Sequence, residues 1–200
     1  MLEINTPIHD LKNHQLESGF TLIELMVTIA LLAILMAVAT PSFVSYRRNS
    51  ELTSITNTFA ASVNAARSES LKINKNVLVV PTNNDDDWSQ GWYVFVDMDF
   101  SGTYNSGDII LMSQDAPPNY ISITGNGTTK EDPSYILYNG SGFSRTLENA
   151  PGASTMQISR KDTAETDYKG IRRLKISFTG RLRVCTPTSA SDSNCTATAE

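Results

Sequence analysis

The hydrophobic residues of this 200-residue chain follow three successive patterns. In the first, from Phe20 to Ala39, every residue is apolar except Thr21, Glu24 and Thr28. A helix of about 20 apolar residues is about 30 Å long, which matches the hydrocarbon core of a bilayer. The first pattern therefore predicts a membrane-spanning helix, and Glu24 places a costly carboxylate inside it.

The second pattern is amphipathic and continues the helix beyond the membrane. Apolar residues recur at spacings of three and four, with one skip at Ser70, which is typical of a helix that packs one face on a domain. We expect one helix from Phe20 to about Ile73, on the order of 80 Å long, with a kink or local unwinding at Pro41. The residues of the packed face are Leu52, Ile55, Phe59, Val63, Ala66 and Ile73.

The third pattern begins after Asn76 and consists of short apolar runs separated by turn residues, which is typical of β-strands. The run 92–97 is apolar on both faces, so we expect a central strand there. The fold class predicted is α+β, with a long N-terminal helix packed on an antiparallel β-sheet or small sandwich. The expected strands are 77–80, 92–97, 109–112, 120–124, 135–138, 156–159, 174–178 and 182–185.

The last two expected strands form a hairpin whose register follows from its pattern. A three-residue loop, 178–180, with Gly180 in the left-handed conformation keeps the apolar residues on one face, whereas a two-residue loop mixes the faces. Like charges opposite each other weaken a hairpin, so a cationic face indicates an anionic partner. That face carries Arg173, Lys175, Arg181 and Arg183, and the apolar face carries Leu174, Ile176, Leu182 and Val184.

Charge and composition narrow the function classes. The net charge of −5 gives no nucleic-acid signal for the whole chain, but the segment 85–148 is mostly acidic and the segment 160–183 mostly basic. Both histidines, His9 and His14, precede Gly19, so the rest of the chain lacks the commonest general base and metal ligand. We therefore expect neither an enzyme nor a cofactor.

One acidic segment resembles a calcium-binding loop. Asp97, Asp99, Ser101 and, at the twelfth position, Asp108 follow the spacing of such a loop. The segment departs from that pattern because it ends in aspartate instead of a bidentate glutamate and has no entering helix. The alternative is a polar connection between two β-strands, and on that interpretation no metal is bound.

The segment Gly19-Phe20-Thr21-Leu22-Ile23-Glu24-Leu25 resembles the start of a type IV prepilin. The resemblance implies that a prepilin peptidase cuts after Gly19 and that Phe20 becomes the methylated N-terminus. It also implies that Glu24 pairs, during filament assembly, with the Phe20 ammonium of a neighbouring subunit. The alternative is a secretory signal cleaved after Ala39; the missing basic region, the charge of Glu24 and the continuing helix count against it.

Two further segments resemble the FimT/FimU and GspH branch of minor pilins and minor pseudopilins. The first consists of residues 91–97, followed by Asp99, Gly102 and residues 108–111. The second consists of residues 178–183. The resemblance implies a minor type IV pilin that is accessory to pilus assembly, is no enzyme and has other major and minor pilins as partners. Two alternatives remain: a minor pseudopilin of type II secretion, and a membrane-tethered periplasmic binding protein that does not polymerise.

The resemblance also bears on the cationic hairpin. Some FimT-type pilins bind DNA during natural transformation through a C-terminal Gly-Arg-x-Arg motif, which stands here at Gly180, Arg181 and Arg183. With Arg173 and Lys175, these residues form the candidate site for double-stranded DNA, contacted through its phosphates without sequence preference. The alternative is a solvated edge hairpin whose charges prevent aggregation of the sheet.

The resemblance divides the chain into four parts. They are a leader at 1–19, a transmembrane and filament-core half of the helix at 20–46, an amphipathic half at 47–75, and a β-rich domain at 76–200. The protein is expected to cross the inner membrane once, with its C-terminal domain in the periplasm, and to enter the pilus after assembly. Arg47 and Arg48 alone favour the opposite orientation. In an exported chain, Cys185 and Cys195 are expected to form a disulfide that closes a C-terminal loop.

Overall fold

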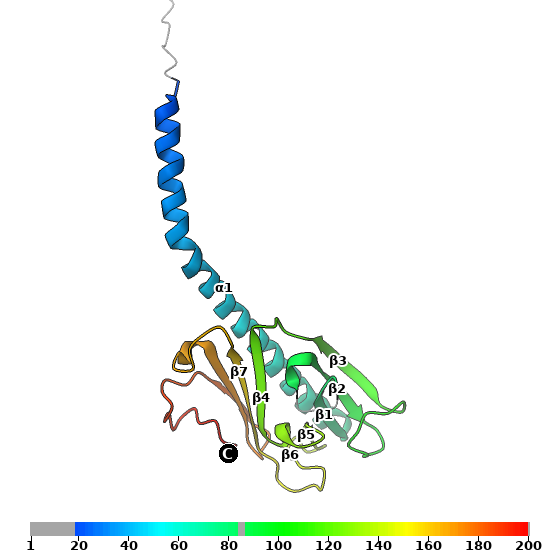
Figure 1. Ribbon diagram of the computed structural model, residues 1–200. Helices are drawn as coiled ribbons and strands as arrows, with labels where there is room; N and C mark the ends of the chain where they lie inside the picture. Colours follow the sequence, from blue (N-terminus) through cyan, green and yellow to red (C-terminus); the bar gives the residue numbers. More distant parts are fainter. Residues whose placement is uncertain (1–18, 84–86, 200) are drawn as a thin grey trace, which may run out of the picture. The chain divides into compact units, whose positions relative to one another are not determined.

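The computed structural model describes residues 19–83 and 87–199, so the expected leader before Gly19 lies outside the described residues. The chain divides into two compact units, one ending at Val44 and the other beginning at Ser45. Each unit is described by itself. Figure 1 shows the chain, with the long helix and most of the strands labelled.

The helix α1 (Leu22–Ile73) is the long helix that the sequence predicts. Its assignment continues through Pro41, so the local unwinding expected at that residue is not found. Up to Val44 its side chains are exposed, and its apolar window has a mean hydropathy of 2.7. Within the described part of the chain, α1 is the one helix long and apolar enough to cross a membrane.

From Ser45 onward, α1 packs one face on the β-strands. Leu52, Phe59, Val63 and Ala66 are buried there as expected, and Ile55 is partly buried. Ile73 is exposed, contrary to the prediction, because it is the last residue of the helix and the chain turns away towards β1. Near that end the buried position is Ser70, and Ser62 and Thr56 are buried further back along the helix; the hydroxyls of all three donate to carbonyls of the preceding helical turn.

The strands form two antiparallel sheets, as the predicted fold class requires. The first sheet has the order β3-β2-β1-β5-β6 and the second the order β4-β7-β8-β9. The strands are β1 (Asn76–Pro81), β2 (Gly91–Asp97), β3 (Ile109–Asp115), β4 (Ile121–Gly127), β5 (Ile136–Tyr138), β6 (Ser144–Arg145), β7 (Ser154–Arg160), β8 (Ile171–Ile176) and β9 (Leu182–Cys185).

Most of the expected strands are present, and β2 lies between β1 and β3 as predicted for a central strand. The strand β8 begins at Ile171 and ends at Ile176, so Phe178 belongs to the loop. The strand β6 was not predicted, because a two-residue strand has no alternation to detect.

The main core lies between α1 and both sheets. Phe59 of α1 contacts the rings of Trp88 and Trp92, with centroid distances of 5.6 and 4.9 Å. Both indole N–H groups are satisfied: Trp92 Nε1 donates to Ser62 Oγ and Trp88 Nε1 to the carbonyl of Thr129. A smaller cluster packs on the opposite face of the first sheet and contains Leu78, Val80, Phe95, Tyr135 and Leu137. The strand β2 contributes to both clusters, which explains its apolar residues on both faces.

The strand β3 forms an open edge of the first sheet. Four consecutive apolar side chains on it are exposed: Ile109, Ile110, Leu111 and Met112. An uncovered apolar edge offers unpaired backbone groups to another chain, and natural proteins usually protect such edges.

A polar cluster holds the start of the second unit's helical segment on the second sheet. Asp162 accepts hydrogen bonds from Arg160 Nη2 at 2.7 Å and from Arg48 Nη1 at 2.7 Å. Arg160 is nearly buried and also donates to the carbonyl of Ser45. Tyr120 lies under the Arg48 guanidinium and donates to the carboxylate of Glu51. The hydrogen bonds of Asp162 and of Glu51 therefore join residues 45–51 to the second sheet and its adjoining loops.

The two arginines, Arg160 first, lower the pKa of the Asp162 carboxyl well below its usual range. The carboxylate therefore contributes stability that is present above the ordinary aspartate pKa of about 3.9 and is lost as the pH falls. We predict that Asp162→Asn lowers the free energy of unfolding at pH 7 by roughly 1–2 kcal/mol, a value reduced for partial exposure.

Urea unfolding of the full chain in detergent at several pH values tests this prediction. Between pH 5 and pH 3 the unmodified chain should lose stability more steeply than Asp162→Asn. Glu165→Gln, an exposed position on the same segment, is the matched control. Parallel pH profiles for the unmodified chain and Asp162→Asn would contradict the prediction.

Candidate functional site

The N-terminal segment of α1 begins with a reciprocal capping arrangement. The Glu24 carboxylate accepts hydrogen bonds from the backbone N–H of Thr21 at 2.9 Å and from its hydroxyl at 2.8 Å. The N–H of Glu24 in turn donates to Thr21 Oγ1 at 3.3 Å. This is a capping box, and it gives the carboxylate partners within its own chain. Phe20 and Gly19 precede it and are exposed.

The C-terminal hairpin has the register that the sequence predicts. Lys175 pairs with Arg183 and Arg173 with Cys185, and the N–H of Ser177 donates to the carbonyl of Arg181. Gly180 has a φ of +80°, and a Cβ atom there would lie 2.1 Å from the carbonyl oxygen of Gly142. Both its conformation and its surroundings therefore require glycine.

Two residues that the sequence did not indicate hold the hairpin tip. Arg67 of α1 donates to the carbonyls of Gly142 and Thr179, at 3.0 and 3.1 Å. The hydroxyl of Tyr138 on β5 donates to the carbonyl of Gly180 at 3.3 Å. These contacts cannot be predicted from a local sequence motif, because each joins segments more than 40 residues apart. The tip is thereby fixed to the core.

The predicted four-cation face has the expected register, but two of its four cations are buried. Arg181 is exposed and Arg183 is half-buried, but Arg173 and Lys175 are only 9% and 4% exposed. Arg173 donates to Gln157 Oε1 at 2.9 Å and to the carbonyl of Cys195. Lys175 Nζ donates to Thr196 Oγ1 at 2.6 Å. The segment after Cys195 thus covers half of the predicted face.

The disulfide explains this covering. Cys185 and Cys195 are bonded, with their Cα atoms 5.9 Å apart, and the bond returns the chain to the second sheet. Beyond Cys195, the carbonyl of Ala197 accepts from Asn126 on β4 at 3.2 Å, and that of Thr198 accepts from the hydroxyl of Thr155 on β7 at 3.0 Å. The C-terminal segment 195–198 therefore crosses β4, β7 and β8.

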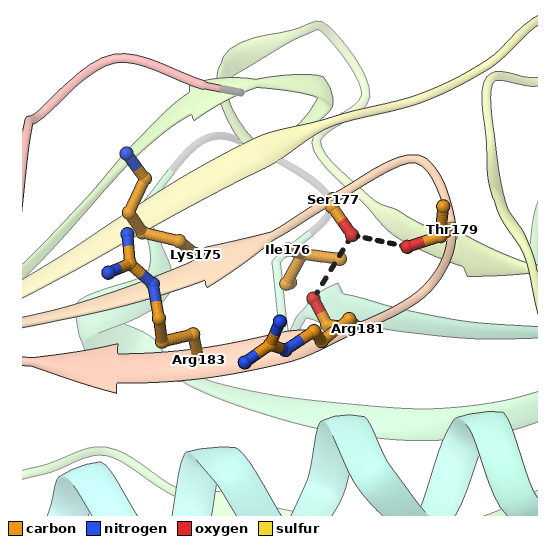
Figure 2. Close-up of a pocket in the computed structure, with 6 residues that line it drawn as sticks. All are labelled: Lys175, Ile176, Ser177, Thr179, Arg181 and Arg183. Carbon is orange, nitrogen blue, oxygen red and sulfur yellow. Dashed lines mark hydrogen bonds between the residues drawn. The ribbon is translucent and has the colours of Figure 1, made fainter. Parts of the chain in front are cut away.

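A depression of about 420 Å³ lies at the hairpin. Figure 2 shows Lys175 and Arg183 side by side on neighbouring strands, with Arg181 next to the loop. Among the residues that the structure describes, none that lines it is acidic; they are Lys175, Ile176, Ser177, Thr179, Arg181 and Arg183. The arrangement suits an anion, because guanidinium groups bind phosphate oxygens as planar forks.

The acidic segment forms the connection between β2 and β3. Carboxylate oxygens of Asp97, Asp99 and Asp108 lie within 4.8 Å of one another. Asp97 accepts from the N–H groups of Ser101 and Gly102, and Asp108 from those of Met98 and Asn105. Burial raises the pKa of Asp97, while hydrogen bonds from Ser101 lower that of Asp99. These bonds account for the loop as a polar strand connection, and the calcium interpretation stays a prediction.

Comparison with known proteins decides the family. The family model described as Type II transport protein GspH matches residues 56–191, which includes most of the second unit. This chain belongs to that family. A model of the prokaryotic N-terminal methylation motif matches residues 15–40. Together they make the chain a minor type IV pilin or pseudopilin of the FimT/FimU–GspH family.

A solved structure agrees with this chain in fold. A crystal structure of the type IV minor pilin FimU from Pseudomonas aeruginosa has a TM-score of 0.51 and 23% identity, and the match covers 72% of this chain and 98% of that one. A second crystal form of FimU has a TM-score of 0.49 and 21% identity, covering 68% and 98%. No curated protein matches the chain.

The family gives the coarse function. Its members are structural proteins of pili and pseudopili that assemble with other pilins, and they are not enzymes. The apolar helix and the methylation motif indicate membrane anchoring and incorporation into a filament.

The acidic loop of this chain gives a testable prediction. Asp97→Ala leaves the N–H group of Gly102 without its acceptor and that of Ser101 with Asp99 alone, so we expect a loss of about 1–3 kcal/mol in the free energy of unfolding. Thermal unfolding of the full chain in detergent measures it. Asp99→Ala, which removes an exposed acceptor of Ser101 and Asn105, should cost less. Millimolar calcium should leave the melting temperature unchanged. A rise of several degrees that needs Asp97, Asp99 and Asp108 would instead establish an ion site.

Proposed function

We propose that this minor pilin spans the inner membrane once, with its second unit in the periplasm, and joins a type IV pilus after cleavage following Gly19. We further propose that its C-terminal hairpin binds double-stranded DNA through phosphates during uptake. The observation that carries the second proposal is the pair Arg181 and Arg183, which face one depression from a hairpin fixed to the core.

The start of α1 supports the assembly half of the proposal. A carboxylate among apolar side chains needs a partner, and the capping box supplies one in the single chain. In a filament, the Phe20 ammonium of a neighbouring subunit is the stronger partner, because away from water a carboxylate binds a cationic donor more strongly than the neutral donors of Thr21. The open apolar edge of β3 also suits contact with another pilin.

The hairpin supports the DNA half of the proposal. Its tip is anchored by Arg67 and Tyr138, so little conformational freedom is lost when Arg181 contacts a ligand. Two cations without an aromatic row predict weak binding that is independent of sequence and sensitive to salt.

For assembly, we predict that Glu24→Gln leaves the chain in the membrane fraction but removes it from sheared pili, because the neutral amide gives the Phe20 ammonium no countercharge. Immunoblots of membrane and pilus fractions measure both. Thr28→Val, a polar position one turn further along α1, is the control and should be incorporated normally. Normal incorporation of Glu24→Gln would contradict the proposed pairing.

For DNA, we predict that Arg181→Gln with Arg183→Gln weakens retention of duplex DNA at least tenfold at low salt. For this variant, the slope of log affinity against log salt concentration should be shallower by about 2, since each phosphate contact contributes about 0.9 to that slope. Gel shifts with the full chain in detergent measure this. Lys130→Gln with Lys161→Gln removes the same charge from exposed positions elsewhere and is the matched control. Equal losses in both variants would show a general charge effect and would sink the proposal.

The family description also supports a second candidate, a minor pseudopilin of type II secretion. Piliation, transformation and secretion measured in one deletion strain separate the two. Loss of secretion with normal piliation and transformation would favour the pseudopilin.

A further inference from the structure

We infer that a hollow on the second sheet binds a small organic acid through its carboxylate group. The hollow has a volume of about 480 Å³, which lies in the range of small-molecule sites. It is distinct from the depression at the hairpin, because none of the described residues lines both. The inference therefore goes beyond the proposed DNA function and does not depend on it.

The floor of the hollow consists of two neighbouring cross-strand pairs. Gln157 of β7 pairs with Arg173 of β8, and Ser159 pairs with Ile171. Side chains alternate between the two faces of a sheet, and Ile158, between Gln157 and Ser159, belongs to the core. The floor therefore lies on the face of the second sheet that is turned away from the core.

Two loops form the walls. The loop closed by the disulfide contributes Ala190, and the N–H of Thr188 in that loop donates to Asp192 at 3.0 Å. In the connection between β7 and β8, the N–H of Asp167 donates to the carbonyl of Ala164 at 2.8 Å. Both walls are thus shaped without a ligand, which lowers the cost of ordering on binding. The connection contributes Lys161, Thr163, Ala164, Glu165 and Tyr168.

Arg173 is the cation of the floor, and only 9% of it is exposed. Its Nε donates to Gln157 Oε1 at 2.9 Å and its Nη1 to the carbonyl of Cys195. Both acceptors are neutral, and none of the ion pairs among the described residues includes Arg173. A buried charge without a countercharge is costly. A carboxylate in the hollow would supply that countercharge.

The floor also offers donors that the described hydrogen bonds leave unused. Nη2 of Arg173 has no partner among the described residues. The amide oxygen of Gln157 accepts from Arg173, so its amide nitrogen is a second donor. The hydroxyl of Ser159 is a third donor on the same face. Three donors around one cation suit the two oxygens of a carboxylate, since charge-assisted hydrogen bonds are the strong ones.

The charges of the lining residues favour a ligand with a single negative charge. Arg160 is already paired with Asp162. The other charged residues described in the lining are Lys161, Arg173 and Glu165, which together carry one positive charge. One carboxylate neutralises this charge. A phosphate dianion or a polyanion would bring further negative charge close to Glu165 and is disfavoured.

The rest of the lining favours an apolar body on the ligand. Tyr168 and Ile171 are half-buried, and Ala164 and Ala190 are exposed on the walls. An aromatic ring or a short hydrocarbon chain above the carboxylate would remove these surfaces from water. The expected ligand class is therefore a monocarboxylic acid with a ring or a short chain.

The test uses benzoate as the probe, benzamide as its neutral isostere, and the full chain in detergent. Isothermal titration measures binding. We expect saturable binding of benzoate with a dissociation constant on the order of 1 mM, as for a ligand of this size, and at least tenfold weaker binding of benzamide. Inorganic phosphate at the same concentration should compete poorly.

Three substitutions locate the site. Arg173→Gln should weaken benzoate binding at least tenfold and Ser159→Ala about threefold. Ala164→Phe narrows the hollow from an exposed position outside the core and should abolish binding, which keeps the test decisive if Arg173→Gln fails to fold. Arg181→Gln removes the same charge from the hairpin and is the matched control, with unchanged benzoate binding.

The possible outcomes separate this inference from the DNA proposal. Arg181→Gln with Arg183→Gln should lose DNA retention and keep benzoate binding; loss of both would show that the two sites are not distinct. Equal binding of benzamide, or competition by phosphate as strong as that by benzoate, would overturn the carboxylate assignment. Unchanged benzoate binding in Ala164→Phe would overturn the hollow as the site. If no duplex binds but benzoate does, only the DNA proposal fails.

Discussion

The packing of Phe59 against Trp88 and Trp92 is the contact on which the second unit depends. Phe59 stands on the inward face of α1, Trp92 on β2, and Trp88 on the short turn before it. Around these rings, residues of α1 meet apolar residues of both sheets, so one core holds three layers together. The indole N–H groups donate to Ser62 and Thr129. Because these polar groups have partners, both large indole rings can be fully buried.

Arginines fix the two ends of the helical segment that carries this core. Near Ser45, Arg160 and Arg48 converge on Asp162, and near the other end Arg67 reaches the hairpin tip. The guanidinium groups of Arg160 and Arg67 each donate to two residues at once, which suits arginine's planar fork. Such connections hold the hairpin tip at a fixed position on the packed part of the helix.

In the C-terminal hairpin, the disulfide decides which of the predicted cations are exposed. The alternation of residues puts four cations on one face, but the disulfide returns the chain over β8 and covers two of them. The covered pair is bound by neutral oxygens of Gln157, Cys195 and Thr196. The candidate DNA site is therefore smaller than the predicted four-cation face, although Arg181 and Arg183 of the motif stay at least partly exposed.

The sequence by itself determined what depends on local periodicity. It predicted the helix to Ile73, the two-sided strand β2, the three-residue loop at Gly180 and the register of Lys175 with Arg183, because side-chain direction repeats regularly in helices and strands. Only the tertiary structure decided which of those side chains meet water. The anchoring of Gly180 by Arg67 and Tyr138, and the burial of Lys175 by Thr196, arise from segments that are distant along the chain or joined through a disulfide loop. No local pattern encodes such contacts, since they follow from how the whole chain packs.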